Sequence, residues 1–104
     1  MAGDAMKVLS DDFKQQVVEI MHLSKKVNGD DSSKILDMIC KHTEEISQLY
    51  KQNDTHWRME TADLMVLCCE LLLMHNQNVD DIVTRCLPRF YTKLQRINKE
   101  GERV

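Results

Sequence analysis

Hydrophobic side chains recur every three or four residues along four stretches of this chain, which is the spacing of amphipathic helices. The four predicted helices cover about residues 11–27, 33–52, 56–75 and 79–98. Polar residues separate them at residues 28–31, 53–55 and 76–78. Because these connections are short, neighbouring helices are expected to be antiparallel. The predicted fold class is therefore an all-α bundle of about four helices.

Polar side chains mark where these helices begin. Ser10 is placed to cap the first helix, Asp54 or Thr55 the third, and Asn78 the fourth. Pro88 falls inside the fourth stretch, where it is expected to kink or interrupt the helix.

The third predicted helix is the most hydrophobic. Between Leu64 and Met74 only Glu70 is charged, and apolar side chains cover almost the whole circumference. A helix that is apolar all round is buried all round. It is therefore expected to lie at the centre of the bundle or to be covered by a second subunit. Since 104 residues can hardly cover it alone, the sequence predicts a homodimer or a homotetramer.

Length and composition limit the alternatives. The chain has 104 residues, enough for one domain over residues 1–104, of which residues 1–10 and 99–104 are expected to be flexible. Three glycines and one proline are too few for the turns of an all-β domain. A net charge of −3 argues against a nucleic-acid partner. No apolar run matches a membrane span or a signal core, so a cytoplasmic protein is expected.

The cysteines fall within the apolar helical patterns, at Cys40, Cys68, Cys69 and Cys86. They form no CxxC pair and no zinc-ligand spacing. We therefore interpret them as reduced core cysteines.

Two acidic clusters flank the break between the second and third helices, EEISQ at residues 44–48 and ETAD at residues 60–63. Residues three apart share a helix face, so Glu45 pairs with Gln48, and Glu60 with Asp63. If the hairpin is centred on Asp54, Glu45 is level with Asp63, and Gln48 with Glu60. The spacing then predicts one cluster of three carboxylates and one amide.

Carboxylates held together repel one another unless a proton or a cation neutralises them. A hard divalent cation with oxygen ligands meets that need, and Mg²⁺ is the expected ion, with Mn²⁺ as the alternative. The spacing alone leaves a second interpretation open, in which these charges form a solvated edge and are close only in sequence.

These motifs resemble the signature of the all-α nucleoside triphosphate pyrophosphohydrolase superfamily, which includes MazG-type enzymes, phosphoribosyl-ATP pyrophosphohydrolases and dimeric dUTPases. The signature is EExxE followed, after a short spacer, by ExxD. The resemblance covers about residues 33–99. The chain departs from it at Gln48, which stands where the family has its third glutamate.

The resemblance implies a MazG-like fold and Mg²⁺-dependent hydrolysis of nucleoside triphosphates to monophosphates and pyrophosphate, which would cleanse the nucleotide pool. It implies a metal-ligand set of Glu45, Gln48, Glu60 and Asp63. Glu44, together with Glu45, is the candidate for orienting the attacking water, or it is an exposed partner of a lysine. The alternatives are a phosphoribosyl-ATP pyrophosphohydrolase of histidine biosynthesis and, because Gln48 carries no charge, a non-catalytic helical interaction module.

Basic and aromatic residues are candidates for binding the nucleotide. A row along one side of the fourth helix can hold anionic oxygens or be a solvated face; it consists of Arg85, Arg89, Lys93 and Arg96. Lys41 lies near the acidic cluster in sequence. Trp57 precedes Glu60 by about one turn, where its ring can stack on a base or pack in the core.

The histidines are assigned no metal role from the sequence. His42 shares a stripe with apolar residues, and we interpret it as a hydrogen-bonded packing residue. His22, His56 and His75 are too scattered along the chain to predict a metal site.

Overall fold

The computed structural model describes residues 7–101, which form four helices and no strand. In chain order these are α1 (Asp11–Asn28), α2 (Ser32–Lys51), α3 (Trp57–Met74) and α4 (Val79–Glu100). The prediction of an all-α fold with four helices is confirmed, and every observed boundary lies within two residues of the predicted one. Residues 1–6 and 102–104, which belong to the ends expected to be flexible, lie outside the described residues.

Side-chain caps explain where three of the helices begin. On α2, Asp31 Oδ1 accepts a hydrogen bond from Ser33 N at 2.9 Å. Ser10 Oγ accepts a hydrogen bond from Phe13 N at 3.1 Å, and Asn78 Oδ1 accepts one from Asp81 N at 3.0 Å. Each bond satisfies a backbone donor that the first helical turn leaves free. In the turn before α3, Asp54 Oδ1 accepts a hydrogen bond from His56 N at 2.9 Å, so the predicted capping side chain satisfies a backbone donor there, while the N-cap residue His56 makes no side-chain cap bond.

The helix α4 continues through Pro88, so the expected interruption does not occur. A proline removes one backbone donor from a helix. Since α4 has 22 residues, the remaining backbone bonds keep the helix continuous on both sides of Pro88.

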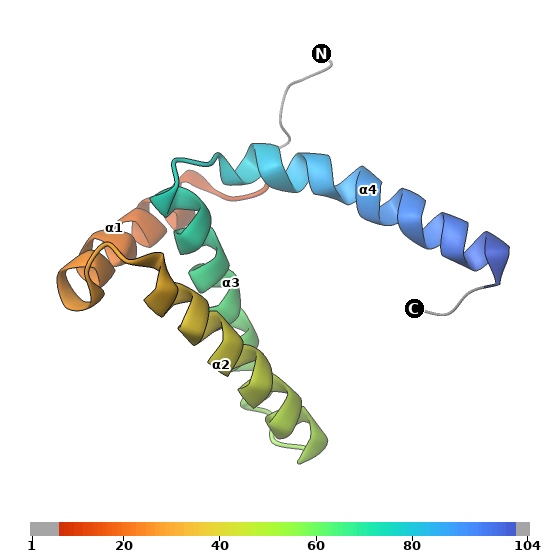
Figure 1. The fold of residues 1–104 in the computed structure, drawn as a ribbon, viewed down its shortest axis with the longest axis horizontal. Coiled ribbons are helices and arrows are strands. Elements are labelled where there is room, and N and C mark those ends of the chain that lie inside the picture. Colours follow the sequence, from red (N-terminus) through yellow and green to blue (C-terminus); the bar gives the residue numbers. More distant parts are fainter. Residues whose placement is uncertain (1–6, 102–104) are drawn as a thin grey trace.

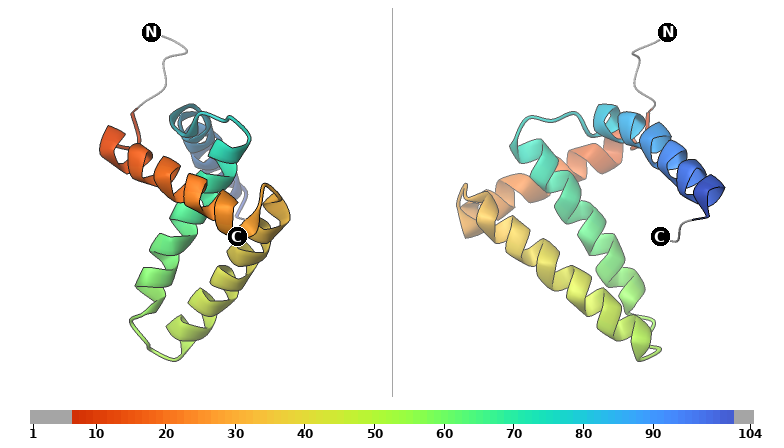
Figure 2. Two further views of the ribbon diagram at one scale, coloured as in Figure 1. Left: turned by 90° about the vertical axis from the view of Figure 1, so that its left-hand side faces the viewer. Right: turned by 45° about the vertical axis from the view of Figure 1, so that its right-hand side comes forward.

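The helices α2 and α3 form an antiparallel hairpin, and α1 packs across the end of the hairpin that is farthest from its turn (Figures 1 and 2). The helix α4 starts at that same end and extends away from the hairpin (Figure 1). Because α3 contacts all three other helices, it is the central element.

One copy of the chain buries few side chains. Its buried hydrophobic residues are Val17 of α1, Ile35 of α2 and Val79 of α4. The expectation that α3 is buried on every side is not met by one chain, because Met65 remains 61% exposed. Cys40 and Cys68 are also exposed, so the prediction of core cysteines is wrong for these two, and all four thiols are free.

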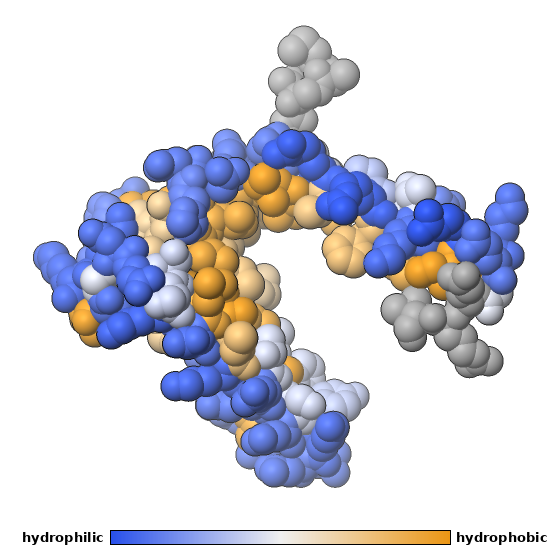
Figure 3. Space-filling model, viewed as in Figure 1, coloured by the Kyte–Doolittle hydropathy of each residue, from blue (hydrophilic) through white to orange (hydrophobic). Residues whose placement is uncertain are grey.

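Much of the apolar surface faces the open side of the molecule. Figure 3 shows apolar atoms over α3 and along the side of α4 that faces the space between them. On α4 the exposed large hydrophobic residues are Leu87, Phe90, Tyr91 and Leu94. Among the described residues, no helix combines the length and the hydropathy that crossing a membrane requires.

Asp80, in the first turn of α4, holds the segment that leads into α1. Its Oδ1 accepts hydrogen bonds from Val8 N at 2.9 Å and from Leu9 N at 3.1 Å, and its Oδ2 accepts one from Lys14 Nζ. The Lys14 bond lowers the pKa of the Asp80 carboxyl below its usual 3.8, burial opposes this, and the two backbone bonds add to the lowering. The start of α1 is thereby fixed to the start of α4.

Candidate metal centre

The turn between α2 and α3 determines which side chains of the two helices face each other. Asn53 adopts a left-handed conformation with φ 59°. Asp54 N then donates to Leu49 O at 2.9 Å, which brings residue 54 back beside residue 49. This is the hydrogen-bond pattern of a helix that ends with a left-handed residue. The hairpin is therefore centred near residues 51–52 instead of on Asp54.

This register places His42 of α2 opposite the acidic residues of α3. His42 Nε2 lies 3.3 Å from Glu60 Oε2 and 3.8 Å from Asp63 Oδ2. One ligand atom from each of the three residues lies within 4.8 Å of the others. The levels expected from the sequence, with Glu45 beside Asp63, are thus displaced by about one helical turn.

The orientation of the His42 ring follows from its second nitrogen. Nδ1 lies 2.8 Å from Met38 O, one turn earlier in α2. A carbonyl oxygen can only accept, so Nδ1 carries the proton and donates it. In the neutral ring Nε2 therefore presents its lone pair to the two carboxylates. The expected hydrogen bond of His42 is present, but the ring also belongs to the polar cluster.

Glu60 is the central residue of the cluster. Its side chain is only 13% exposed, and its other oxygen, Oε1, lies 3.3 Å from His56 Nε2. One carboxylate thus lies between two imidazoles, His42 from α2 and His56 from the turn. Asp63, at 58% exposure, lies on the open side of the same cluster.

The structure leaves the other candidates of the acidic motifs outside this cluster. All are exposed residues of α2, namely Lys41, Glu44, Glu45 and Gln48. Within residues 7–101 their side chains make no hydrogen bond or ion pair, and none of them belongs to the cluster. Trp57 is half-buried at the start of α3, where its ring meets the edge of Tyr50 with centroids 5.5 Å apart.

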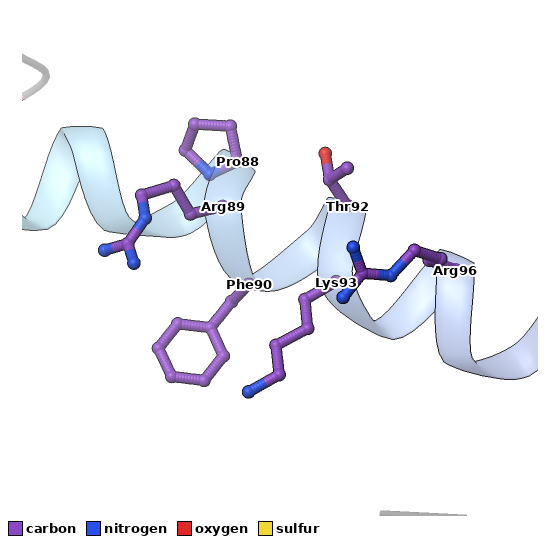
Figure 4. Close-up of a pocket in the computed structure, with 6 residues that line it drawn as sticks. All are labelled: Pro88, Arg89, Phe90, Thr92, Lys93 and Arg96. Carbon is purple, nitrogen blue, oxygen red and sulfur yellow. The ribbon is translucent and has the colours of Figure 1, made fainter. Parts of the chain in front are cut away.

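The basic row lies on α4, which extends away from the α2–α3 hairpin (Figure 1). Arg85 pairs with Asp81 on its own helix. The other three members line an open hollow whose six residues all come from α4: Pro88, Arg89, Phe90, Thr92, Lys93 and Arg96. Figure 4 shows Phe90 and Lys93 pointing to the same side of the helix, with Arg89 extending along it. Since α4 extends away from the hairpin, one chain does not bring this row to Glu60 and Asp63 (Figures 1 and 2).

His42 and His56 are the residues beside Glu60 that sequence reasoning missed. His42 lies three residues before Glu45, on the same face of α2. Its proximity to Glu60 depends on the left-handed Asn53, because the register of the hairpin starts there. An Asn-Asp pair at the end of a helical pattern is the signal that could have suggested this turn.

Comparisons of this chain with protein-family models, with curated proteins and with solved structures found no match. The resemblance to the pyrophosphohydrolase superfamily rests on the motifs at residues 44–48 and 60–63.

Proposed function

We propose that this protein is a divalent-cation-dependent pyrophosphohydrolase of the MazG-like type, which cleaves nucleoside triphosphates to monophosphates and pyrophosphate in the cytoplasm. One observation carries the proposal: Glu60 and Asp63, from the motif at residues 60–63, gather with His42 on the α2–α3 hairpin. Cleansing of the nucleotide pool is the role that we assign to this reaction.

The residues of the cluster fit a divalent cation. Two carboxylates one turn apart supply negative charge, and the cluster is open to solvent at Asp63. When bound, Mg²⁺ or Mn²⁺ neutralises phosphate charge and acts as a Lewis acid. Glu60 and Asp63 are the residues that would hold it. Glu45 and Gln48, exposed on α2 nearby in sequence, are the proposed further ligands, and Gln48 contributes no charge.

The surrounding residues would bind and orient the substrate. Glu44, with Glu45, is proposed to orient the attacking water. Lys41 adjoins His42 on α2 and offers an ammonium group to phosphate, and Trp57 offers an aromatic edge one turn before Glu60. Arg89, Lys93 and Arg96 would act on the hairpin of a second copy, because their own hairpin lies on another arm of the molecule.

A homodimer or homotetramer is part of this proposal. One copy leaves Met65 of α3 and Phe90 of α4 exposed, both large apolar side chains. A second copy would cover them and could place the basic row near the acidic cluster of its neighbour.

Release of pyrophosphate tests the proposal. Wild-type protein with Mg²⁺ or Mn²⁺ is offered a panel of nucleoside triphosphates, deoxynucleoside triphosphates and phosphoribosyl-ATP, with EDTA as the metal-free control. Glu60→Gln and Asp63→Asn are expected to abolish release, whereas Asp37→Asn, exposed on α2, should leave it unchanged. Release from phosphoribosyl-ATP alone would favour the histidine-pathway enzyme.

A helical interaction module is the alternative that a specific observation favours. The α4 helix leaves an apolar side exposed, and Gln48 removes a charge from the family's acidic set. If no substrate in the panel gives metal-dependent release, this alternative replaces the enzymatic proposal.

A further inference from the structure

The environment of His42 Nε2 is that of a metal ligand. Because Nδ1 donates to Met38 O, the Nε2 lone pair of the neutral ring points at Glu60 Oε2 and Asp63 Oδ2. A lone pair repels carboxylate oxygens at these distances, so the arrangement needs either a proton on Nε2 or a cation shared by the three groups, and the three ligand atoms lie close enough to share one. A histidine that binds a metal typically donates its other N–H to a backbone carbonyl or a carboxylate, which is the bond that Met38 receives.

The separations of the three residues agree with those of neighbouring ligands around one ion. Ligands about 2.1 Å from a tetrahedral Zn²⁺ lie about 3.4 Å from one another. The Nε2–Oε2 and Nε2–Oδ2 distances are 3.3 Å and 3.8 Å. The three ligand atoms therefore need only small side-chain adjustments to enclose an ion, and the exposed side of Asp63 leaves a fourth position for water.

The donor set distinguishes between cations. Mg²⁺ prefers oxygen ligands and keeps much of its water, whereas imidazole suits Zn²⁺ and other first-row transition metals. We infer that His42, Glu60 and Asp63 form a binding site that prefers a transition-metal ion of the Zn²⁺ class to Mg²⁺. His56, whose Nε2 lies 3.3 Å from Glu60 Oε1, is within reach as a further ligand.

This inference shares Glu60 and Asp63 with the proposed function but does not require catalysis. It adds nitrogen ligation to a site that the sequence motif describes by oxygen donors alone. Zn²⁺ and Mg²⁺ would then compete for the same two carboxylates.

Metal titration of the full chain tests the inference. Metal-free protein is titrated calorimetrically with Zn²⁺ alone and with Mg²⁺ alone at pH 7.5, and with Co²⁺ while the visible absorption is recorded. We expect one Zn²⁺ per chain, bound at least about tenfold more tightly than Mg²⁺, and Co²⁺ bands of a four-coordinate nitrogen–oxygen site. His42→Gln should weaken Zn²⁺ binding by about tenfold or more, and His75→Gln, an exposed histidine at the end of α3, should not.

The free cysteines are the competing Zn²⁺ ligands. Burial raises the pKa of the Cys69 thiol, with a smaller contribution from Cys68, which disfavours its thiolate. Thiolate ligation would appear as an intense near-ultraviolet Co²⁺ band. Three results would each overturn the inference: that band, equal Zn²⁺ affinity in wild type and His42→Gln, or no Zn²⁺ binding. If His42→Gln does not fold, Glu60→Gln and Asp63→Asn supply the same comparison.

The two proposals fail separately. Zn²⁺ binding that depends on His42, without release of pyrophosphate from any substrate, would overturn the proposed function and leave this site. Mg²⁺-dependent release combined with metal binding that is independent of His42 would overturn the inferred site and leave the proposed function.

Discussion

Lys14 Nζ donates a hydrogen bond to Asp80 Oδ2 across 66 positions of sequence, joining α1 to the first turn of α4. The same carboxylate receives Val8 N and Leu9 N, so one side chain satisfies three donors from the beginning of the described chain. Asp80 also lies at the helix N-terminus, where negative charge is favoured. The contact fixes the position of α4 relative to α1.

Replacing Asp80 is expected to destabilise the fold in a pH-dependent way. The Lys14 bond lowers the folded-state pKa of Asp80 below 3.8, so the ionised carboxylate stabilises the fold above its unfolded-state pKa. This contribution is lost as the pH falls through the lowered folded-state pKa. Asp80→Asn should therefore lower Tm at pH 7, and its Tm should approach that of wild type below pH 3.8. Thermal melts between pH 2 and 7 measure both effects.

Asp81→Asn is the matched control for this prediction. Asp81 is half-buried, with its side chain 45% exposed, and pairs with Arg85 on its own helix at 3.2 Å. Surface pairs of this kind contribute little. An equal loss of Tm in the two variants would contradict the role assigned to Asp80.

Glu70 is the buried acid of α3, and replacing its carboxyl with an apolar group is expected to stabilise the protein. It is 2% exposed, and its Oε2 has no hydrogen-bond partner. An unsatisfied buried polar group costs about 1–3 kcal/mol. We expect Glu70→Met to raise the free energy of unfolding by that amount in urea titrations, and Glu44→Met, on the exposed side of α2, to change it by less than about 0.5 kcal/mol. A less stable Glu70→Met protein would show that the carboxyl has a stabilising partner.

Asn53 is predicted to be sensitive to side chains that disfavour a left-handed backbone. Its φ of 59° suits asparagine and glycine, whereas alanine loses about 1–2 kcal/mol there. Asn53→Ala should therefore lower the free energy of unfolding by about 1 kcal/mol, and Asn53→Gly should be nearly neutral. The control is Gln52→Ala, at φ −87°. Equal stability of the alanine and glycine variants would contradict the turn described above.

The apolar side of α4 is expected to contribute to self-association. Phe90 is 64% exposed, and Leu94 follows it one turn later on the same side. Light scattering of wild type at micromolar concentration should give a mass of at least two chains. Phe90→Asp or Leu94→Asp should shift it towards one chain, while Gln95→Asp, on another face, should not. A monomeric wild type would contradict the expectation.

Local signals in the sequence predicted the helices well, and distant contacts explain what they could not predict. Ser10 and Asn78 cap α1 and α4 through bonds to residues three positions away, so both starts were readable from the sequence. The position of α4 depends on Asp80 and Lys14, which no sequence pattern connects.

Within the candidate site, the acidic pair on α3 followed from helical spacing, because Glu60 and Asp63 are one turn apart. The position of His42 opposite them could not be predicted from helical spacing. It depends on how tightly α2 ends, through Asn53 and the bond from Asp54 N to Leu49 O. A hairpin assumed to be symmetric about Asp54 places Glu45 where the structure has His42.

The turn at Asn53 contains none of the three clustered residues, yet its length determines whether a nitrogen or an oxygen atom lies opposite the acids of α3. Shortening this connection by about three residues would move Glu60 one helical turn towards the C-terminal end of α2 and place Glu45 opposite it instead of His42. The atom opposite Glu60 would then be a carboxylate oxygen instead of an imidazole nitrogen, although none of the clustered residues is substituted. Under the metal binding that we propose, insertions and deletions in this loop would change which atom lies opposite the acids of α3, and with it the ion that the site prefers.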